Sequence, residues 1–159
     1  MSKCAVIRWK PLALCILIPL AVGAVVGFLT SGSMQDYTNL QQPPLSPPGV
    51  VFPIVWMILY ILMGISAYLV LESSVTSRMK ALRVFGLQLF VNALWPIIFF
   101  NLKMRLFAFF WLIFLIILIV WMMVLFYRIN KTAAYLQLPY LIWSIFAGYL
   151  NLGVFLLNQ

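Results

Sequence analysis

Side chains that could carry out chemistry are few in this sequence. It has no histidine, and its only carboxylate side chains are those of Asp36 and Glu72. A nucleophile with its base, or a cluster of metal ligands, needs more such groups than these. We therefore expect no acid–base catalytic residues, no metal site and no required cofactor. Histidine is also the commonest axial ligand of haem, so a bound pigment would have to be held by ring contacts and hydrogen bonds.

Aromatic and amide side chains do recur, at the spacing of a helix face. Each set repeats every three or four residues and so lies along one side of its helix. The sets are Trp56, Tyr60, Gly64 and Ala67; Gln88, Asn92 and Pro96 with Trp95 beside them; and Tyr140, Ser144, Ala147 and Asn151 with Trp143 beside them. Because an amide facing lipid would lack a partner, these faces are predicted to point inward. Spacing alone allows either hydrogen bonds between helices or the wall of a ligand pocket.

The elements that must position these faces are transmembrane helices. Of the 159 residues, 66% are hydrophobic and 8% are charged, a balance that no soluble domain of this length could bury. Helices about 20 residues long cross a bilayer, and the apolar runs predict spans at 11–30, 50–71, 82–101, 106–127 and 134–157. The first run is too long for a cleaved signal peptide. The sequence predicts an all-α membrane protein, one five-transmembrane-helix bundle over residues 1–159.

The net charge of +8 lies in the segments between these runs. Eight basic residues fall on the side of the N-terminus and two on the other side, which predicts a multi-pass protein of the cell membrane with a cytoplasmic N-terminus and an external C-terminus. Basic residues placed in this way do not form a nucleic-acid-binding face. Cys4 and Cys15 are too few for a disulfide framework and are expected to be reduced.

Three segments carry further expectations. The loop 31–49 contains Pro43, Pro44, Pro47 and Pro48, so we expect a polyproline-like segment without helix that is either a lid or a simple linker. The span 106–127 is apolar on every side and is expected to be a wall facing lipid. In the first span, Gly23 and Gly27 predict a close helix contact, and Pro19 predicts a bend.

The sequence also resembles a known family in motifs that cover most of the chain. The run from Leu45 to Trp56 (LSPPGVVFPIVW), continued by Tyr60 and Gly64, closely resembles the signature of the tryptophan-rich sensory protein/translocator protein (TspO/MBR) family. Further matches are Tyr37-x-x-Leu40-x-x-Pro43 in the loop, Asn92-x-x-Trp95 in the third span, and Pro139-Tyr140-x-x-Trp143-x-x-Phe146-Ala147-x-x-Leu150-Asn151 in the fifth. The resemblance implies a five-helix bundle, commonly a homodimer, that binds porphyrins such as protoporphyrin IX and synthetic aromatic ligands under the first loop.

This resemblance favours a pocket over simple helix contacts for the inward faces. The ligand-binding residues it implies, taken with those faces, are Tyr37, Leu40, Pro43, Pro47, Trp56, Tyr60, Asn92, Trp95, Trp143, Ser144, Ala147 and Asn151. Two features depart from the family. Asp36 and Leu45 stand where many bacterial members have aromatic residues, which weakens stacking from the lid. The segment after Asn151 lacks the basic residue of a cholesterol motif, so cholesterol binding is not expected.

Three functions are compatible with these observations. The first is a receptor or sensor for a flat tetrapyrrole, because an aromatic-lined pocket with a few polar groups suits such a ring. The second is light-dependent porphyrin oxidation, with Trp56 and Trp143 as reaction partners. The third is a carrier or scaffold for a lipid-soluble molecule.

Overall fold

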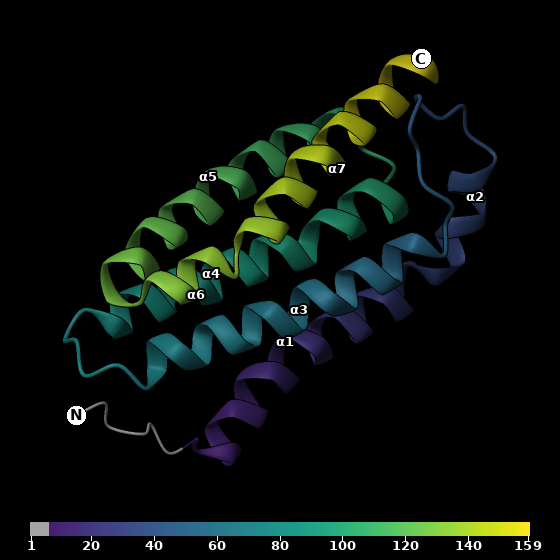
Figure 1. Ribbon diagram of the computed structural model, residues 1–159. Helices are drawn as coiled ribbons and strands as arrows, with labels where there is room; N and C mark the ends of the chain where they lie inside the picture. The colour runs from purple at the N-terminus through teal and green to yellow at the C-terminus, as the bar shows by residue number, and fades with distance from the viewer. Residues whose placement is uncertain (1–6) are drawn as a thin grey trace.

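The computed structural model describes residues 7–159, which form five long helices and four short helical segments (Figure 1). The long helices are α1 (Trp9–Thr30), α3 (Val51–Leu71), α4 (Arg78–Pro96), α5 (Arg105–Ile129) and α7 (Leu138–Leu157); the short ones are η1 (Ser31–Ser33), α2 (Met34–Thr38), the π-helical turn η2 (Ile97–Asn101) and α6 (Lys131–Tyr135). Within the part of the chain that the structure describes, five stretches are long and apolar enough to cross a membrane. The predicted all-α fold with five spans is confirmed, and Cys4 lies outside the described residues.

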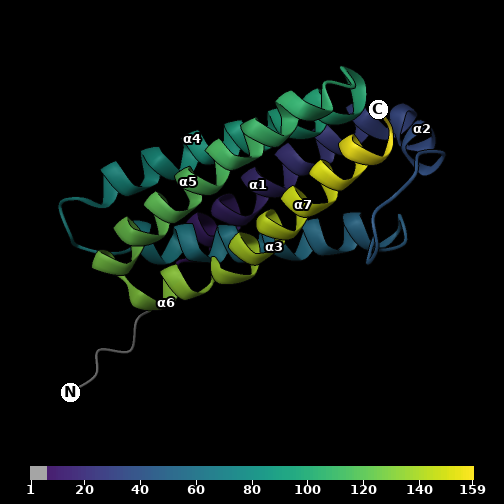
Figure 2. The ribbon, with the colours of Figure 1, turned by 90° about the horizontal axis from the view of Figure 1, so that it is seen from above.

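The helices run along a common direction and give the molecule two distinct ends. One end carries most of the basic residues, and we call it the basic end; it holds the start of α1, the α3–α4 connection and the α5–α6 turn (Figure 1). The other end, which we call the lid end after the loop 31–49, holds α2, η2 and the C-terminus. Helix α1 packs on α3 and α4, and α5 packs on α4 and α7. Figure 2 shows α4 and α5 side by side along one flank. The backbones of α3 and α7 approach each other much less closely than these pairs do, so side chains fill the space between them.

Small residues explain the close contact between α1 and α3. A Cβ added to Gly23 would overlap the ring of Tyr60, and one added to Gly64 would lie 2.6 Å from the carbonyl oxygen of Cys15. The prediction of a close approach is therefore confirmed at Gly23. It is wrong at Gly27, where a Cβ would meet nothing within 4 Å. Pro19 is buried within α1.

The uniformly apolar sequence of α5 predicts a wall facing lipid, but the structure shows that only part of the helix surface is exposed. One face is buried against α4 and α7, through Ala108, Leu112, Leu115, Leu118, Ile119, Met122 and Phe126. Uniform hydrophobicity hides this face, because lipid and protein interior both accept aliphatic side chains. The most exposed long helix is α1, whose buried residues are Pro19, Val26 and Thr30.

The lid segment is helical in its first part, contrary to the expectation of a segment without helix. Residues 31–38 form η1 and α2, and only residues 39–50 lie outside any helix. The first proline of the loop is Pro43, so every residue before it keeps the backbone N–H that a helix requires. The prolines therefore limit only the second half of the loop.

Candidate functional site

A chain of hydrogen bonds joins three helices in the centre of the bundle. The hydroxyl of Tyr60 donates to Oδ1 of Asn92 (2.9 Å), and Nδ2 of Asn92 donates to the hydroxyl of Tyr140 (3.0 Å). Tyr140 in turn donates to Oε1 of Gln88 (2.8 Å). All four side chains are buried. The amide faces of α4 and α7 thus point inward as predicted, and these amides bind neighbouring helices.

A second set of hydrogen bonds lies nearer the lid end. The indole N–H of Trp95 donates to Oδ1 of Asn151 (3.3 Å), and Nδ2 of Asn151 donates to the backbone carbonyl of Arg105 (2.8 Å). These bonds connect α4, α7 and the start of α5. Both side chains are buried, so they fix how the three helices meet below the lid.

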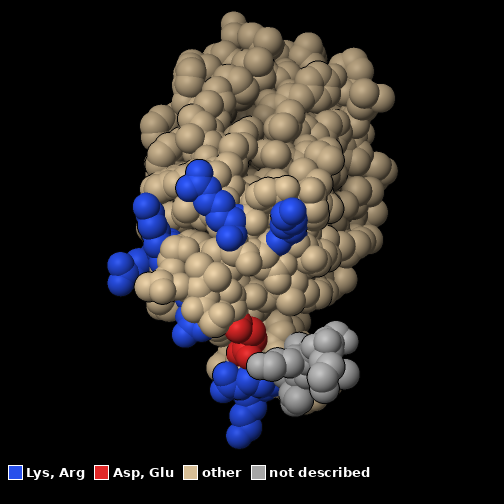
Figure 3. Space-filling model, turned by 60° about the vertical axis from the view of Figure 1, so that its left-hand side comes forward, with Lys and Arg blue, Asp and Glu red and all other residues tan. Residues whose placement is uncertain are grey.

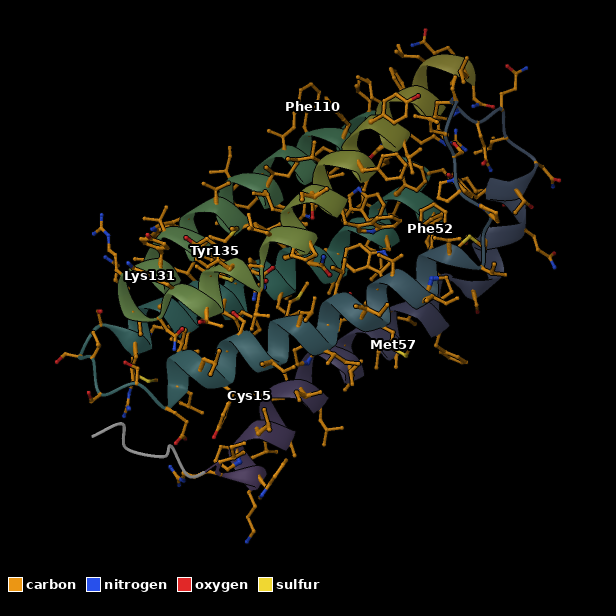
Figure 4. All side chains as sticks on the ribbon, viewed as in Figure 1. Cys15, Phe52, Met57, Phe110, Lys131 and Tyr135 are labelled. Carbon is orange, nitrogen blue, oxygen red and sulfur yellow. The ribbon has the colours of Figure 1, made fainter. Side chains whose placement is uncertain are left out.

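Four aromatic residues fill the space between α3 and α7; we call them the α3–α7 aromatic cluster (Phe52, Trp56, Tyr140 and Trp143). The rings of Phe52 and Trp143 meet edge to face at 5.9 Å between centroids, and those of Trp56 and Tyr140 at 6.2 Å. Trp56 also stacks on Tyr60 at 5.5 Å. Figure 4 marks Phe52 near the start of α3, toward the lid end. Contacts between rings therefore close the α3–α7 side of the bundle, whereas α1 and α3 meet by close approach of their backbones.

Polar atoms without protein partners lie beside this cluster. The indole N–H of Trp143 and the hydroxyl of Ser144 are buried and have no hydrogen-bond partner, and the same holds for Nε2 of Gln88. Leaving a buried donor unsatisfied costs about 1–3 kcal/mol. Trp143 belongs to the cluster and Ser144 follows it on α7, so this part of α7 carries two buried donors that the protein itself does not use.

The lid covers this region through Tyr37. Its buried ring lies 6.4 Å from Phe52, 5.9 Å from Phe99 and 5.4 Å from Phe100, between centroids. Pro96 ends α4, and the chain continues as the π-helical turn η2, which carries Phe99 and Phe100. Proline removes a backbone donor and favours such a break. The rings that hold Tyr37 thus come from α3 and from the turn after α4.

The rest of the lid is fixed to α7. Pro43 packs on Gly153, where an added Cβ would lie 2.6 Å from the proline ring, and the hydroxyl of Tyr149 donates to the carbonyl of Pro44 (2.8 Å). Asn158 pairs with the backbone of Gln41, accepting at 3.0 Å and donating at 2.8 Å. These contacts tie the proline-rich part of the lid to the C-terminal half of α7.

Most of the residues proposed for a ligand site thus converge between α3, α4, α7 and the lid. Tyr37, Pro43, Tyr60, Asn92, Trp95, Ser144, Ala147 and Asn151 are buried, and Leu40, Pro47, Trp56 and Trp143 are half-buried. The sequence analysis did not include Phe52, Phe99 and Phe100 among the candidate site residues, although their rings contact Tyr37 or Trp143. Phe52 lies inside the signature segment, and the other two follow the helix-breaking Pro96, a signal that could have found them.

Charges lie outside this region, at the two ends of the bundle. Figure 3 shows basic side chains gathered around one end of the molecule. Among the described residues, two ion pairs form: Arg8 with Glu72 (3.3 Å) at the basic end, and Lys103 with Asp36 (2.8 Å) at the lid end. The interior is thus lined by rings, amides and hydroxyls, and no metal-binding group of His, Cys, Asp and Glu exists within residues 7–159.

Fold and site together define a multi-pass membrane protein: five helices around an aromatic interior, covered by a proline-rich lid. The TspO/MBR family matches residues 15–157, and the chain belongs to that family. It is 37% identical to "Tryptophan-rich protein TspO" of Archaeoglobus fulgidus over 144 residues (90% of this chain, 94% of that protein) and 39% identical to the protein of the same name from Chlorobaculum tepidum over 150 residues (92% and 95%). It is 34% identical to "Tryptophan-rich sensory protein" of Cereibacter sphaeroides over 127 residues (77% and 76%).

Proposed function

We propose that this protein is a membrane receptor that binds a porphyrin such as protoporphyrin IX, or a similar flat aromatic molecule, at the α3–α7 aromatic cluster. The observation that carries the proposal is the pair of buried, unpartnered donors on Trp143 and Ser144 beside four aromatic rings. A planar tetrapyrrole offers ring faces for the aromatic side chains and carboxylate or ring-nitrogen acceptors for the two donors. Binding needs no metal ligand from the chain.

Ligand entry would require the rings of the cluster to separate. Edge-to-face contacts of this kind contribute only about 0.5–1.5 kcal/mol each beyond the area they bury, and the backbones of α3 and α7 are not in close contact. The lid is the natural gate, because Tyr37 reaches Phe52. The hydrogen bonds of Asn92 lie deeper and would keep α3, α4 and α7 together while the cluster opens.

The test is a titration of the purified protein with metal-free protoporphyrin IX in the dark, followed by quenching of tryptophan fluorescence. Trp143→Phe keeps a ring and removes the N–H, and Ser144→Ala removes the other donor. Both variants are expected to weaken binding, because each removes a donor to the ligand. Trp121→Phe is the matched control, since Trp121 lies on α5 and is 46% exposed. Equal affinity in all four proteins would contradict the proposed site.

A light-dependent reaction is the second candidate, favoured by one observation: Trp56 stacks on Tyr60 and touches Tyr140, so oxidisable rings surround the same site. Steady illumination of the protein–porphyrin mixture distinguishes the two roles. With a receptor, the porphyrin absorbance falls in light only as fast as that of free porphyrin. A degrading protein accelerates this bleaching, and Trp56→Phe would slow the accelerated bleaching. A carrier would release the same ligand to acceptor vesicles in the dark.

We further infer that the protein lies in the cell membrane with its N-terminus in the cytoplasm. Seven described basic residues support this orientation, since they lie at the end where α1 begins: Arg8, Lys10, Arg78, Lys80, Arg83, Arg128 and Lys131. Basic residues are retained on the cytoplasmic side of a membrane. A homodimer remains an expectation from the family resemblance.

A further inference from the structure

An apolar groove of about 320 Å³ lies at the basic end, between α5 and the α6–α7 turn. Its walls include Val120, Val124, Tyr127, Arg128, Tyr135 and Leu138. Most of these are aliphatic or aromatic, and Arg128 is the one charged lining residue. The groove shares no residue with the α3–α7 aromatic cluster, so the porphyrin proposal does not account for it.

The basic side chains at the groove have no acidic partner among the described residues. Arg128 lines the groove, and the ammonium group of Lys131 lies 5.6 Å from the centroid of the Tyr127 ring. The only two acidic side chains of the sequence are already paired elsewhere, Asp36 with Lys103 and Glu72 with Arg8. No acidic side chain of this protein therefore remains to neutralise Arg128 and Lys131. Figure 4 shows Lys131 and Tyr135 at the basic end of the bundle.

The groove is apolar along its length, and its one charged lining residue, Arg128, lies at the end away from Val120. Arg128 is in the last turn of α5, and Val120 is eight residues earlier, about 12 Å deeper at 1.5 Å per residue. Tyr127 and Tyr135, which meet edge to face at 6.1 Å, are residues of the kind found at the headgroup level. A phospholipid has the matching layout, with a phosphate at the interface and an acyl chain below it.

We propose that this groove binds one anionic phospholipid. The phosphate lies at Arg128 and Lys131, and an acyl chain lies along Val120, Val124 and Leu138. A membrane leaflet supplies the charge that the chain lacks, because juxtamembrane basic residues attract anionic lipids. The aliphatic floor gives the acyl chain a fixed place on the protein, so the site selects a lipid by its headgroup while holding it by its tail.

The test is native mass spectrometry of the full-length protein in detergent, titrated with dioleoyl phosphatidylglycerol or dioleoyl phosphatidylcholine. The wild type should retain one phosphatidylglycerol molecule in preference to phosphatidylcholine. Arg128→Gln should reduce that preference about fivefold, the scale of one basic residue near an anionic headgroup. Lys80→Gln is the matched control, because Lys80 is an exposed basic residue at the same end that does not line the groove. It should leave the preference unchanged.

A second pair of variants tests the apolar part without changing charge. Leu138→Trp and Val124→Trp each fill the groove and should abolish retention of the first lipid while the thermal unfolding midpoint stays close to that of the wild type. Equal retention of the two lipids by the wild type, or an equal loss with Lys80→Gln, would overturn the proposal. Competition by soluble glycerol phosphate would reveal a simple anion site. If the two tryptophan variants lost a dimer and bound the lipid as the wild type does, the groove would be an interface between two copies and the proposal would be wrong.

Discussion

At the scale of single residues, the inward polar groups fall into two kinds. Asn92 uses both ends of its amide, accepting from Tyr60 and donating to Tyr140. Trp143 and Ser144 keep their donors unused. The first kind holds helices together, and the second is available to a ligand. The interpretation as hydrogen bonds between helices is therefore confirmed for Asn92, and the interpretation as a ligand pocket stays a prediction for Trp143 and Ser144.

The role of Asn92 predicts graded losses of stability. Tyr60→Phe removes one hydrogen bond and should lower the free energy of unfolding by about 0.6 kcal/mol, the mean for such bonds between membrane helices. Asn92→Ala removes two bonds and leaves a small cavity, so it should cost about 1–3 kcal/mol. Thermal unfolding in detergent, followed by near-ultraviolet circular dichroism, measures both. A larger loss for Tyr60→Phe than for Asn92→Ala would contradict the central position of Asn92.

The ligand site proposed at Trp143 predicts a loss of affinity when this residue is replaced. Trp143→Ala should weaken porphyrin binding by about 1–3 kcal/mol, the scale of one aromatic contact with a planar ring. Trp121→Ala should change it little, because Trp121 is on the exposed side of α5. Both variants lose an indole, so the contrast depends only on position. Equal losses in two folded variants, measured by fluorescence quenching, would make the inward-facing site wrong.

At the scale of helices, contact distance separates two kinds of interface. Glycine allows α1 and α3 to approach until Gly64 meets the backbone of Cys15 and Ile16. Between α3 and α7, aromatic rings take the place of backbone contact. An interface of the first kind has no room to adapt, whereas rings can change rotamer. The α3–α7 side is therefore the one suited to admit a ligand.

The α1–α3 contact predicts a sharp difference between two glycines. Gly64→Ala places a methyl group against backbone atoms, which cannot move aside as a side chain can, and should cost about 1–3 kcal/mol of stability. Gly27→Ala is the control, since an added Cβ there meets nothing within 4 Å and alanine is the better helix former by about 1 kcal/mol. Unfolding midpoints in detergent measure both. A loss for Gly27→Ala as large as that for Gly64→Ala would contradict this account of the contact.

At the scale of the whole molecule, charge is divided between the ends. At the lid end, Lys103 is neutralised by Asp36, which leaves Arg105 as the one other basic residue there among those described. At the basic end, seven described basic residues accompany a single acid, Glu72. Each end has one acid paired with one basic residue, so the excess of positive charge at the basic end comes from its larger number of basic residues.

This asymmetry predicts the topology. A periplasm-active phosphatase fused after Gln159 should be active, and the same reporter inserted after Ser77 should be inactive, because Ser77 lies in the connection at the basic end. A cytoplasm-active fluorescent reporter at the same two positions should give the opposite pattern. Activity of the phosphatase after Ser77 would reverse the proposed orientation. Replacing Arg78, Lys80 and Arg83 with glutamine should weaken the preference for this orientation, because it removes basic residues that hold this connection in the cytoplasm.

The sequence by itself determined the five helices, their inward polar faces and the family. Each follows from local chemistry: a bilayer requires long apolar helices, and an amide such as Asn92 cannot face lipid. Other features were decided only by the tertiary structure. The sequence of α5 is apolar on all sides, so only packing distinguishes Leu115, which is buried, from Trp121, which is exposed. Trp143 has a spare donor and Asn92 has none because of the groups that the other helices bring within hydrogen-bonding distance. The spacing of residues along one helix does not contain that information.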